Sequence, residues 1–248
     1  MQIIEKQELE QILVEHKKWL LTRRSETVEG KRADLSHTDL AKADLAYADL
    51  RYADFTGADL TGTNLTGANL RNANFTGANL REINFRYADL KQADFTGADL
   101  TGANLTGANL LGVNFTNAVL EHANLSNANL SYAILEHANL SNANLSYAVL
   151  KHVDLTGASL RGASLRSLSL READMRGKDL DFCAIPLSCG SLRWKIDRRL
   201  AVQFLYHFCS FECDDKEIQA AQNSLLALAN EFHRVKECGE LKAKPEGN

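Results

Sequence analysis

Residues 98–107 read Ala-Asp-Leu-Thr-Gly-Ala-Asn-Leu-Thr-Gly, which is one five-residue phrase written twice. The phrase continues in both directions, and a large apolar residue, called here the centre of its repeat, stands at every fifth position from Leu35 to Leu180. The residue two before each centre is usually Ala, and the residue directly before it is usually Asp or Asn. This array of 30 repeats fills residues 31–182 and determines the fold.

The period of five residues matches neither an α-helix, with 3.6 residues per turn, nor a β-strand, in which side chains alternate. The chain must therefore turn in every repeat, with the Ala and the centre facing inward and the other three residues facing outward. Short sides joined by turns close into coils that stack at about 4.8 Å. Four centres are phenylalanines at intervals of twenty residues, and they stack if each coil has four sides. They are Phe55, Phe75, Phe95 and Phe115.

The repeat resembles the A(D/N)LXX motif of the pentapeptide-repeat family, and the resemblance covers about three-fifths of the chain. It implies an all-β solenoid, a right-handed quadrilateral β-helix with four pentapeptides in each coil. Thirty repeats would form about 7.5 coils and a rod roughly 35 Å long.

The resemblance also implies an alternative function. Some members of this family resemble duplex DNA in size, shape and charge, and protect type II topoisomerases such as gyrase. Residues 31–182 hold 14 basic and 17 acidic side chains, a net charge of only −3. Because a DNA mimic needs a strong negative field, this near-neutral charge disfavours that function.

The N-terminal segment is expected to cap the array, because a lone amphipathic helix must lie on an apolar surface and the open end of the array is the nearest one. Residues 1–24 carry apolar side chains at spacings of three and four, which predicts an amphipathic capping helix, and residues 25–30 form a polar linker. A helix lying on a membrane surface is the alternative, but its polar face mixes both signs of charge.

The C-terminal segment, residues 183–248, is interpreted as a connector followed by a helical hairpin that seals the second end. Its apolar spacings are helical and it is rich in aromatic residues, so it is the best candidate surface for forming a homodimer. The expected dimer contacts are Trp194, Phe204, Phe208 and Phe211.

Composition limits the partners and the location. The net charge of −4 is mild and predicts no direct binding of nucleic acid. No apolar run reaches the roughly 18 residues of a membrane-spanning helix, and the first residues do not resemble a signal peptide. Five cysteines, an odd number, are interpreted as reduced thiols. Together these features predict a cytoplasmic protein, and we expect a bacterial one.

Two outward surfaces are candidate binding sites. The first is a basic face, formed by the residue after the centre on one side of successive coils, which could hold an anionic surface. Its members are Arg51, Arg71, Lys91, Lys151 and Arg171. The alternative is a solvated face balanced by Asp49 and Asp89 on the same side.

The second candidate is a protein-contact belt within residues 92–150, a stretch with no Lys or Arg. Aromatic side chains on a surface of small residues can anchor a protein partner. The belt residues are His122, Tyr132, His137 and Tyr147. The alternative is that these are ordinary corner residues.

No catalytic, metal or cofactor site is predicted. The aspartates belong to the repeat and face solvent, so nothing shifts their pKa values in a cleft. The Thr-Gly pairs are interpreted as corners, and Cys209 and Cys213 as structural cysteines, since zinc ribbons use Cys-x2-Cys pairs. The sequence therefore predicts a non-enzymatic protein-binding or scaffold protein that presents flat solenoid faces.

Overall fold

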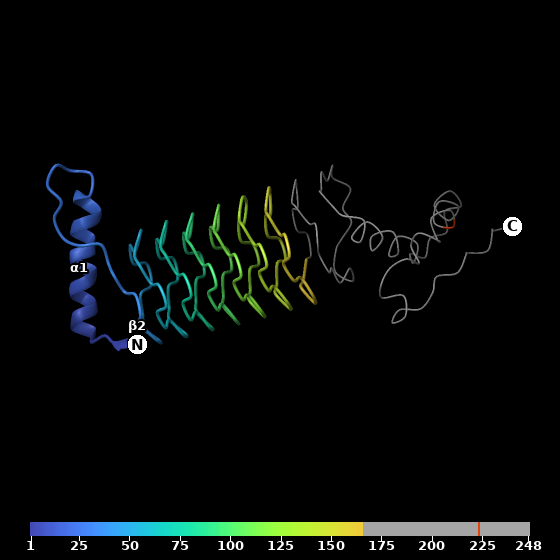
Figure 1. Cartoon of the computed structure of the whole chain (residues 1–248), viewed down its shortest axis with the longest axis horizontal. Coiled ribbons are helices and arrows are strands. Elements are labelled where there is room, and N and C mark those ends of the chain that lie inside the picture. Colours follow the sequence, from blue (N-terminus) through green and yellow to red (C-terminus); the bar gives the residue numbers. More distant parts are fainter. Residues whose placement is uncertain (166–222, 224–248) are drawn as a thin grey trace.

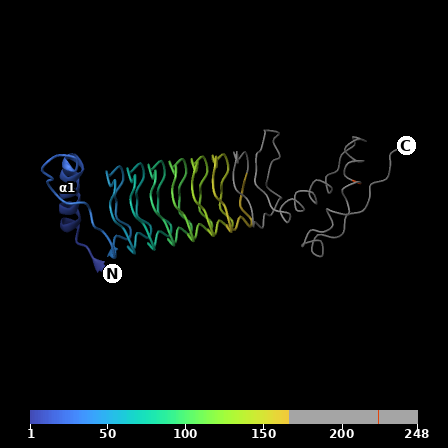
Figure 2. The ribbon, with the colours of Figure 1, turned by 45° about the horizontal axis from the view of Figure 1, so that its top comes forward.

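A computed structural model describes residues 1–165 and Asn223. In this part of the chain, helix α1 (Lys6–Thr22) lies across one end of a rod of stacked coils (Figures 1 and 2). The only strands longer than one residue in the described part are β1 (Gln2–Ile3) and β2 (Thr38–Asp39). The predictions for residues 183–248 and for the total number of coils lie outside the described residues.

Each coil holds four pentapeptides, as the phenylalanine spacing predicts. The residue directly before each centre forms a parallel bridge with the residue twenty positions later, from Asp34–Asp54 to Asn144–Ser164. At each bridge, two neighbouring coils exchange a pair of backbone hydrogen bonds, one donated by each coil. The Leu35 N–H donates to the Asp54 carbonyl at 2.8 Å, and the Asp54 N–H donates to the Ala33 carbonyl at 3.0 Å. The four-sided register is confirmed.

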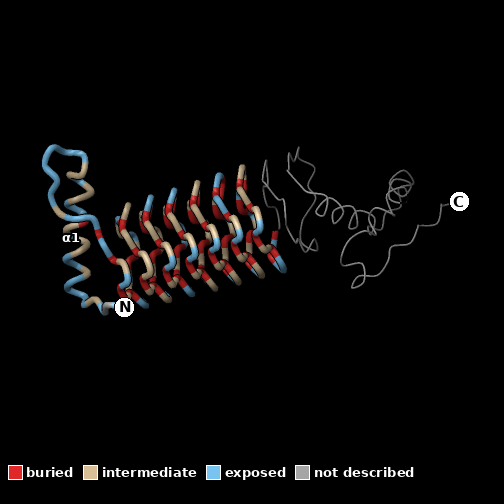
Figure 3. The backbone as a smooth tube through the Cα atoms, in the orientation of Figure 1, coloured by how far each residue is buried: buried red, intermediate tan, exposed pale blue. Residues whose placement is uncertain are grey.

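The interior of the rod is a continuous apolar column, and buried positions recur in every coil of the described rod (Figure 3). The phenylalanine rings stack in it directly, with centroids 4.8 Å apart for Phe55 and Phe75 and 4.7 Å for Phe75 and Phe95. Phe115 continues the stack at 5.0 Å from Phe95. Phe85 comes from another side and meets Phe75 edge-on at 5.7 Å. The separations of the stacked rings, 4.7–5.0 Å, match the distance of about 4.8 Å between neighbouring coils.

The corners are tight turns whose third residue has a positive φ. The Ala58 N–H donates to the Phe55 carbonyl at 3.0 Å across one such corner, and Gly57 has a φ of 61°. Sixteen residues other than glycine also adopt this conformation, so the corner itself does not require glycine. At some glycine corners, however, the corner side chain of the preceding coil lies where a Cβ atom would be. A Cβ atom on Gly67 would lie 2.7 Å from the ring of Tyr47.

The N-terminal segment covers the first coil in two ways. Apolar side chains of α1 pack against the core together with Ile4, which lies two residues before the helix; those of α1 are Leu9, Ile12 and Leu13. Strand β1 pairs in parallel with β2, with Gln2 opposite Thr38 and Ile3 opposite Asp39. Strand β1 therefore takes the place of a coil before the first one. The helix is shorter than residues 1–24, because the chain begins as a strand.

Candidate functional site

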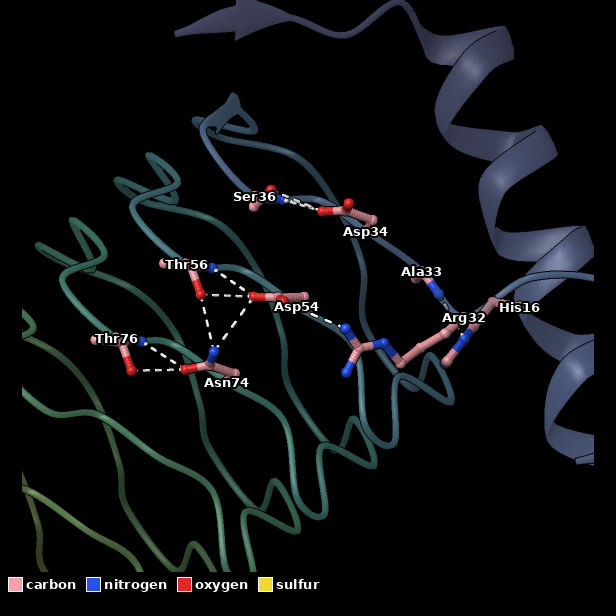
Figure 4. Close-up of polar contacts among 9 residues, drawn as sticks. All are labelled: His16, Arg32, Ala33, Asp34, Ser36, Asp54, Thr56, Asn74 and Thr76. Atoms are coloured by element: carbon pink, nitrogen blue, oxygen red, sulfur yellow. Dashed lines mark hydrogen bonds and ion pairs between the residues drawn. The ribbon is translucent and has the colours of Figure 1, made fainter.

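On the regular outer surface, the Asp or Asn side chain before a centre makes hydrogen bonds to the corner that follows it. The Asp54 carboxylate accepts from the Thr56 N–H at 3.1 Å and from its hydroxyl at 2.6 Å (Figure 4). The Asn74 amide of the next coil donates to the Thr56 hydroxyl at 2.8 Å. Hydrogen bonds of this kind lock the outward carboxylates and amides into the corners. They explain these side chains as architecture, not as catalytic groups.

The register aligns the residues of the basic face along the rod, but two of its arginines are paired with aspartates. Arg51 binds Asp49 through two contacts of 2.7 Å, and the guanidinium of Arg71 lies 3.6 Å from the Asp89 carboxylate. Burial alone would raise the pKa of Asp49, but the hydrogen bonds and charge of Arg51 hold that pKa below its usual range. The twenty-residue register also aligns Lys91 and Lys151 with this face. Arg171 lies outside the described residues.

The four belt residues do not come together. The register places His122, Tyr132, His137 and Tyr147 on four different corners of the rod. The two histidines face neighbouring glutamates, with His122 at 3.6 Å from Glu121 and His137 at 3.7 Å from Glu136. The two tyrosines are at least half exposed, at 55% for Tyr132 and 50% for Tyr147. Any shared surface must therefore be built around the tyrosines with other residues.

Two aliphatic side chains complete such a surface. Ile134 and Val149 stand directly before a centre, where most repeats have Asp or Asn, and they are 42% and 40% exposed. Ile134 bridges Asn114 and Asp154, and Val149 bridges Asn129. The register places both in neighbouring coils, on two sides that meet at the corner of Tyr132. We call Tyr132, Ile134, Tyr147 and Val149 the apolar patch.

The ring of Tyr132 fixes the middle of this patch. It stacks on the His152 ring of the next coil, with centroids 4.8 Å apart and an angle of 23°. Tyr147 occupies the next corner, beyond Val149. The same corner carries Tyr47 and Tyr87 in earlier coils, and both are exposed. Sequence reasoning did not select Tyr47, Tyr87, Ile134 or Val149, although the missing Asn or Asp at two of these positions was a visible signal.

Metal binding and membrane spanning find no support in the described residues. In residues 1–165 and 223, no group of three or more His, Cys, Asp or Glu could hold a metal ion. Within the same residues, no helix combines the length and the apolar character needed to cross a membrane. The predicted dimer contacts Trp194, Phe204, Phe208 and Phe211 lie outside them.

Comparison with solved structures finds several pentapeptide-repeat proteins. HetL from the cyanobacterium Nostoc sp. strain PCC 7120, involved in heterocyst differentiation regulation, is 33% identical, with 58% of this chain and 78% of HetL covered and a TM-score of 0.33. A trypsin-treated QnrB1, a plasmid-mediated fluoroquinolone resistance protein, is 22% identical, with 71% and 97% covered and a TM-score of 0.37.

A pentapeptide-repeat protein of the Arabidopsis thaliana thylakoid lumen is 34% identical, with 43% and 70% covered and a TM-score of 0.28. Because all three TM-scores lie below 0.5, no function is transferred from these proteins to this chain. No curated protein matches the chain.

The family model of pentapeptide repeats matches the chain with 8 copies. The matched segments are residues 31–67, 63–102, 98–136, 108–146, 123–162 and 138–177. Together they span residues 31–177, more than half of the sequence. Proteins of this kind fold as right-handed quadrilateral β-helices, in agreement with the twenty-residue register. The chain belongs to the pentapeptide-repeat family.

Proposed function

We propose that this protein is a non-enzymatic binding scaffold that holds a protein partner on the apolar patch. The observation that carries the proposal is the exposure of Ile134 and Val149 at outward positions that most repeats fill with Asp or Asn. An aliphatic side chain cannot accept the corner N–H, and each such hydrogen bond contributes about 1 kcal/mol. The architecture therefore gives no reason for these two residues, whereas a partner surface does.

The composition of the patch favours a protein partner. Tyrosine and aliphatic side chains, clustered and exposed, are typical of the centre of a protein interface. No lysine or arginine occurs between residues 92 and 150, and Lys151, whose carbonyl accepts from the Tyr132 N–H at 2.8 Å, is a single cation beside the patch, too little positive charge to hold a polyanion. The surface area of four side chains is smaller than the roughly 800 Å² that each partner buries in a stable complex. We therefore propose that the contact surface extends from Tyr147 along the same corner of the rod toward Tyr87.

A DNA-mimic role is not favoured by this surface. Mimicry of a duplex requires closely spaced negative charge, and the patch itself is apolar. We propose the basic face as a secondary contact surface, and the C-terminal segment as the surface for self-association. We also propose that the protein acts in the cytoplasm.

The test compares variants that convert apolar outward residues to the asparagine of the regular repeat. The double variant Ile134→Asn/Val149→Asn removes the aliphatic half of the patch and restores the acceptor at both corners. Val119→Asn is the matched control, because Val119 has the same place in its repeat and lies on the side opposite Val149. Affinity capture from the source organism, followed by titration calorimetry with the captured partner, measures the effect.

We expect the double variant to lose capture while it keeps or gains stability, and Val119→Asn to capture normally. Equal capture by the double variant and the unaltered protein would refute the proposal. Equal loss in the Val119→Asn control would show that the patch is not the contact.

A further inference from the structure

The joint between α1 and the first coil contains one fully buried histidine. His16 is 0% exposed, and its Nδ1 accepts a hydrogen bond from the Ala33 N–H at 2.9 Å (Figure 4). Its ring is nearly parallel to that of Trp19, with centroids 5.8 Å apart. An Nδ1 that accepts a hydrogen bond carries no proton, so the proton of the neutral ring is on Nε2. Among the described residues, Nε2 is buried and has no hydrogen-bond partner.

His16 replaces a bond that later coils make internally. The Ala53 N–H donates to the carbonyl of the preceding centre, Leu50, at 3.1 Å. Ala33 belongs to the first repeat and has no preceding centre. The His16 imidazole fills this role, and the nearby Glu15 carbonyl accepts from the Lys31 N–H at 3.3 Å. Helix α1 therefore closes the first corner with one side-chain acceptor and one backbone acceptor.

The charges around this imidazole are few. Burial lowers the pKa of His16 from its ordinary value. The Asp49 carboxylate and the backbone of Arg51 act against this, and the cations of Arg51 and Arg32 act with it. Asp49 is itself held by Arg51, so its charge is largely engaged. On the helix side, the ring contacts Trp19, which carries no charge.

We propose that His16 is an acid-sensitive latch that fastens the N-terminal cap to the rod. Protonation of Nδ1 would turn the acceptor into a donor that faces the donor N–H of Ala33. It would also place a positive charge in a joint with no solvent contact. Both changes favour the form in which α1 leaves the first coil, where the imidazole is hydrated. The released form exposes the apolar contact between Leu9, Ile12 and the core.

The direction of the pH effect follows from proton linkage. In the released form, His16 titrates near its ordinary pKa of about 6.5. Above that pH both forms are neutral, and the latch is fully closed. Below it, the released form binds a proton that the closed form does not, so the opening equilibrium rises by up to about tenfold per pH unit. The pKa values of Asp34 and Asp49 are lowered, so both stay ionised in this range.

Hydrogen exchange of the whole chain, followed by mass spectrometry at pH 7.5 and 5.5 and corrected for intrinsic exchange rates, tests the proposal. The variant His16→Asn keeps an acceptor oxygen near the position of Nδ1 and does not titrate. His37→Asn is the matched control, because His37 is exposed on the first coil. In the unaltered protein and in His37→Asn, opening of α1 should increase by about tenfold at pH 5.5, while the central coils stay unchanged.

The variant His16→Asn should show no such increase. The same increase in His16→Asn, or none in the unaltered protein, overturns the proposal. Nitrogen chemical shifts of the imidazole in the unaltered protein give a readout that does not depend on the variant's folding. They should show the Nε2–H tautomer persisting below pH 6.5, and a proton on Nδ1 at neutral pH would contradict the latch.

Discussion

Replacing Phe75 by leucine tests whether ring contacts, beyond burial, hold the coils together. Phe75 and Phe115 are both 0% exposed, and leucine fills the same position in most repeats. Phe75→Leu removes three ring contacts, two stacked and one edge-on, whereas Phe115→Leu removes one. An aromatic pair contributes about 0.5–1.5 kcal/mol beyond its buried area. The free energy of unfolding should therefore fall by roughly 1–3 kcal/mol more in Phe75→Leu than in Phe115→Leu.

The two variants can be compared by urea unfolding followed by circular dichroism. With a urea dependence of about 1–3 kcal/mol per molar, the two midpoints should differ by about 1 M. Phe85→Leu removes two edge-on contacts, with Phe75 and Phe95. Its urea midpoint should therefore fall between those of Phe75→Leu and Phe115→Leu. Burial alone predicts the same loss for each variant. Equal midpoints for the three variants would refute the contribution of the rings.

Two further predictions concern the corners. Gly67→Ala should lower the free energy of unfolding by about 1–3 kcal/mol, since φ is +64° and the Tyr47 ring lies where the new Cβ would be. Gly77→Ala has a φ of +63° and open space, so it should lose only about 1 kcal/mol; equal midpoints in urea would contradict the role of the tyrosine. Hydrogen bonds from Ser36 hold the pKa of Asp34 below its usual range, so this carboxylate contributes its stability above pH 4 or so and loses it as the pH falls. In Ser36→Ala, an NMR titration should show the pKa of Asp34 moving up toward its ordinary value, and an unchanged pKa would assign the shift to other groups.

The rod could be predicted because its signal is repeated. An apolar centre at every fifth position predicts sides and corners, and the spacing of Phe55, Phe75 and Phe95 identifies which sides stack. The closure of the first coil gives no such signal. Strand β1 has two residues and pairs with a segment 36 positions later. His16 fits the apolar face of a helix, and only the structure shows that its ring replaces a carbonyl.

The candidate site was harder to predict, because neighbours in the sequence diverge around a coil. Five residues along the chain lead to the next side of the rod, so the four belt residues separate onto four corners. Residues that are twenty apart meet instead, as Tyr132 and His152 do. Surface clusters in this fold must be sought at intervals near twenty. The belt was defined by a continuous stretch of sequence, and such a stretch passes over all four sides of the rod instead of marking one face.

The apolar patch follows from a mismatch between two periods. Residues 120–134 and 135–149 are near-identical blocks of fifteen residues, which is three sides of a four-sided coil. A copied residue therefore lands on the adjoining side in the next coil, and Val119, Ile134 and Val149 ascend the rod as a spiral. A spiral brings only consecutive members together, so it produces a local patch and not a stripe along the rod. Tyr132 occupies the corner between Ile134 and Val149, and Asn117 occupies the corner equivalent to it one block earlier. The exposed apolar surface is therefore concentrated at the later pair, where the three side chains can be covered by one partner.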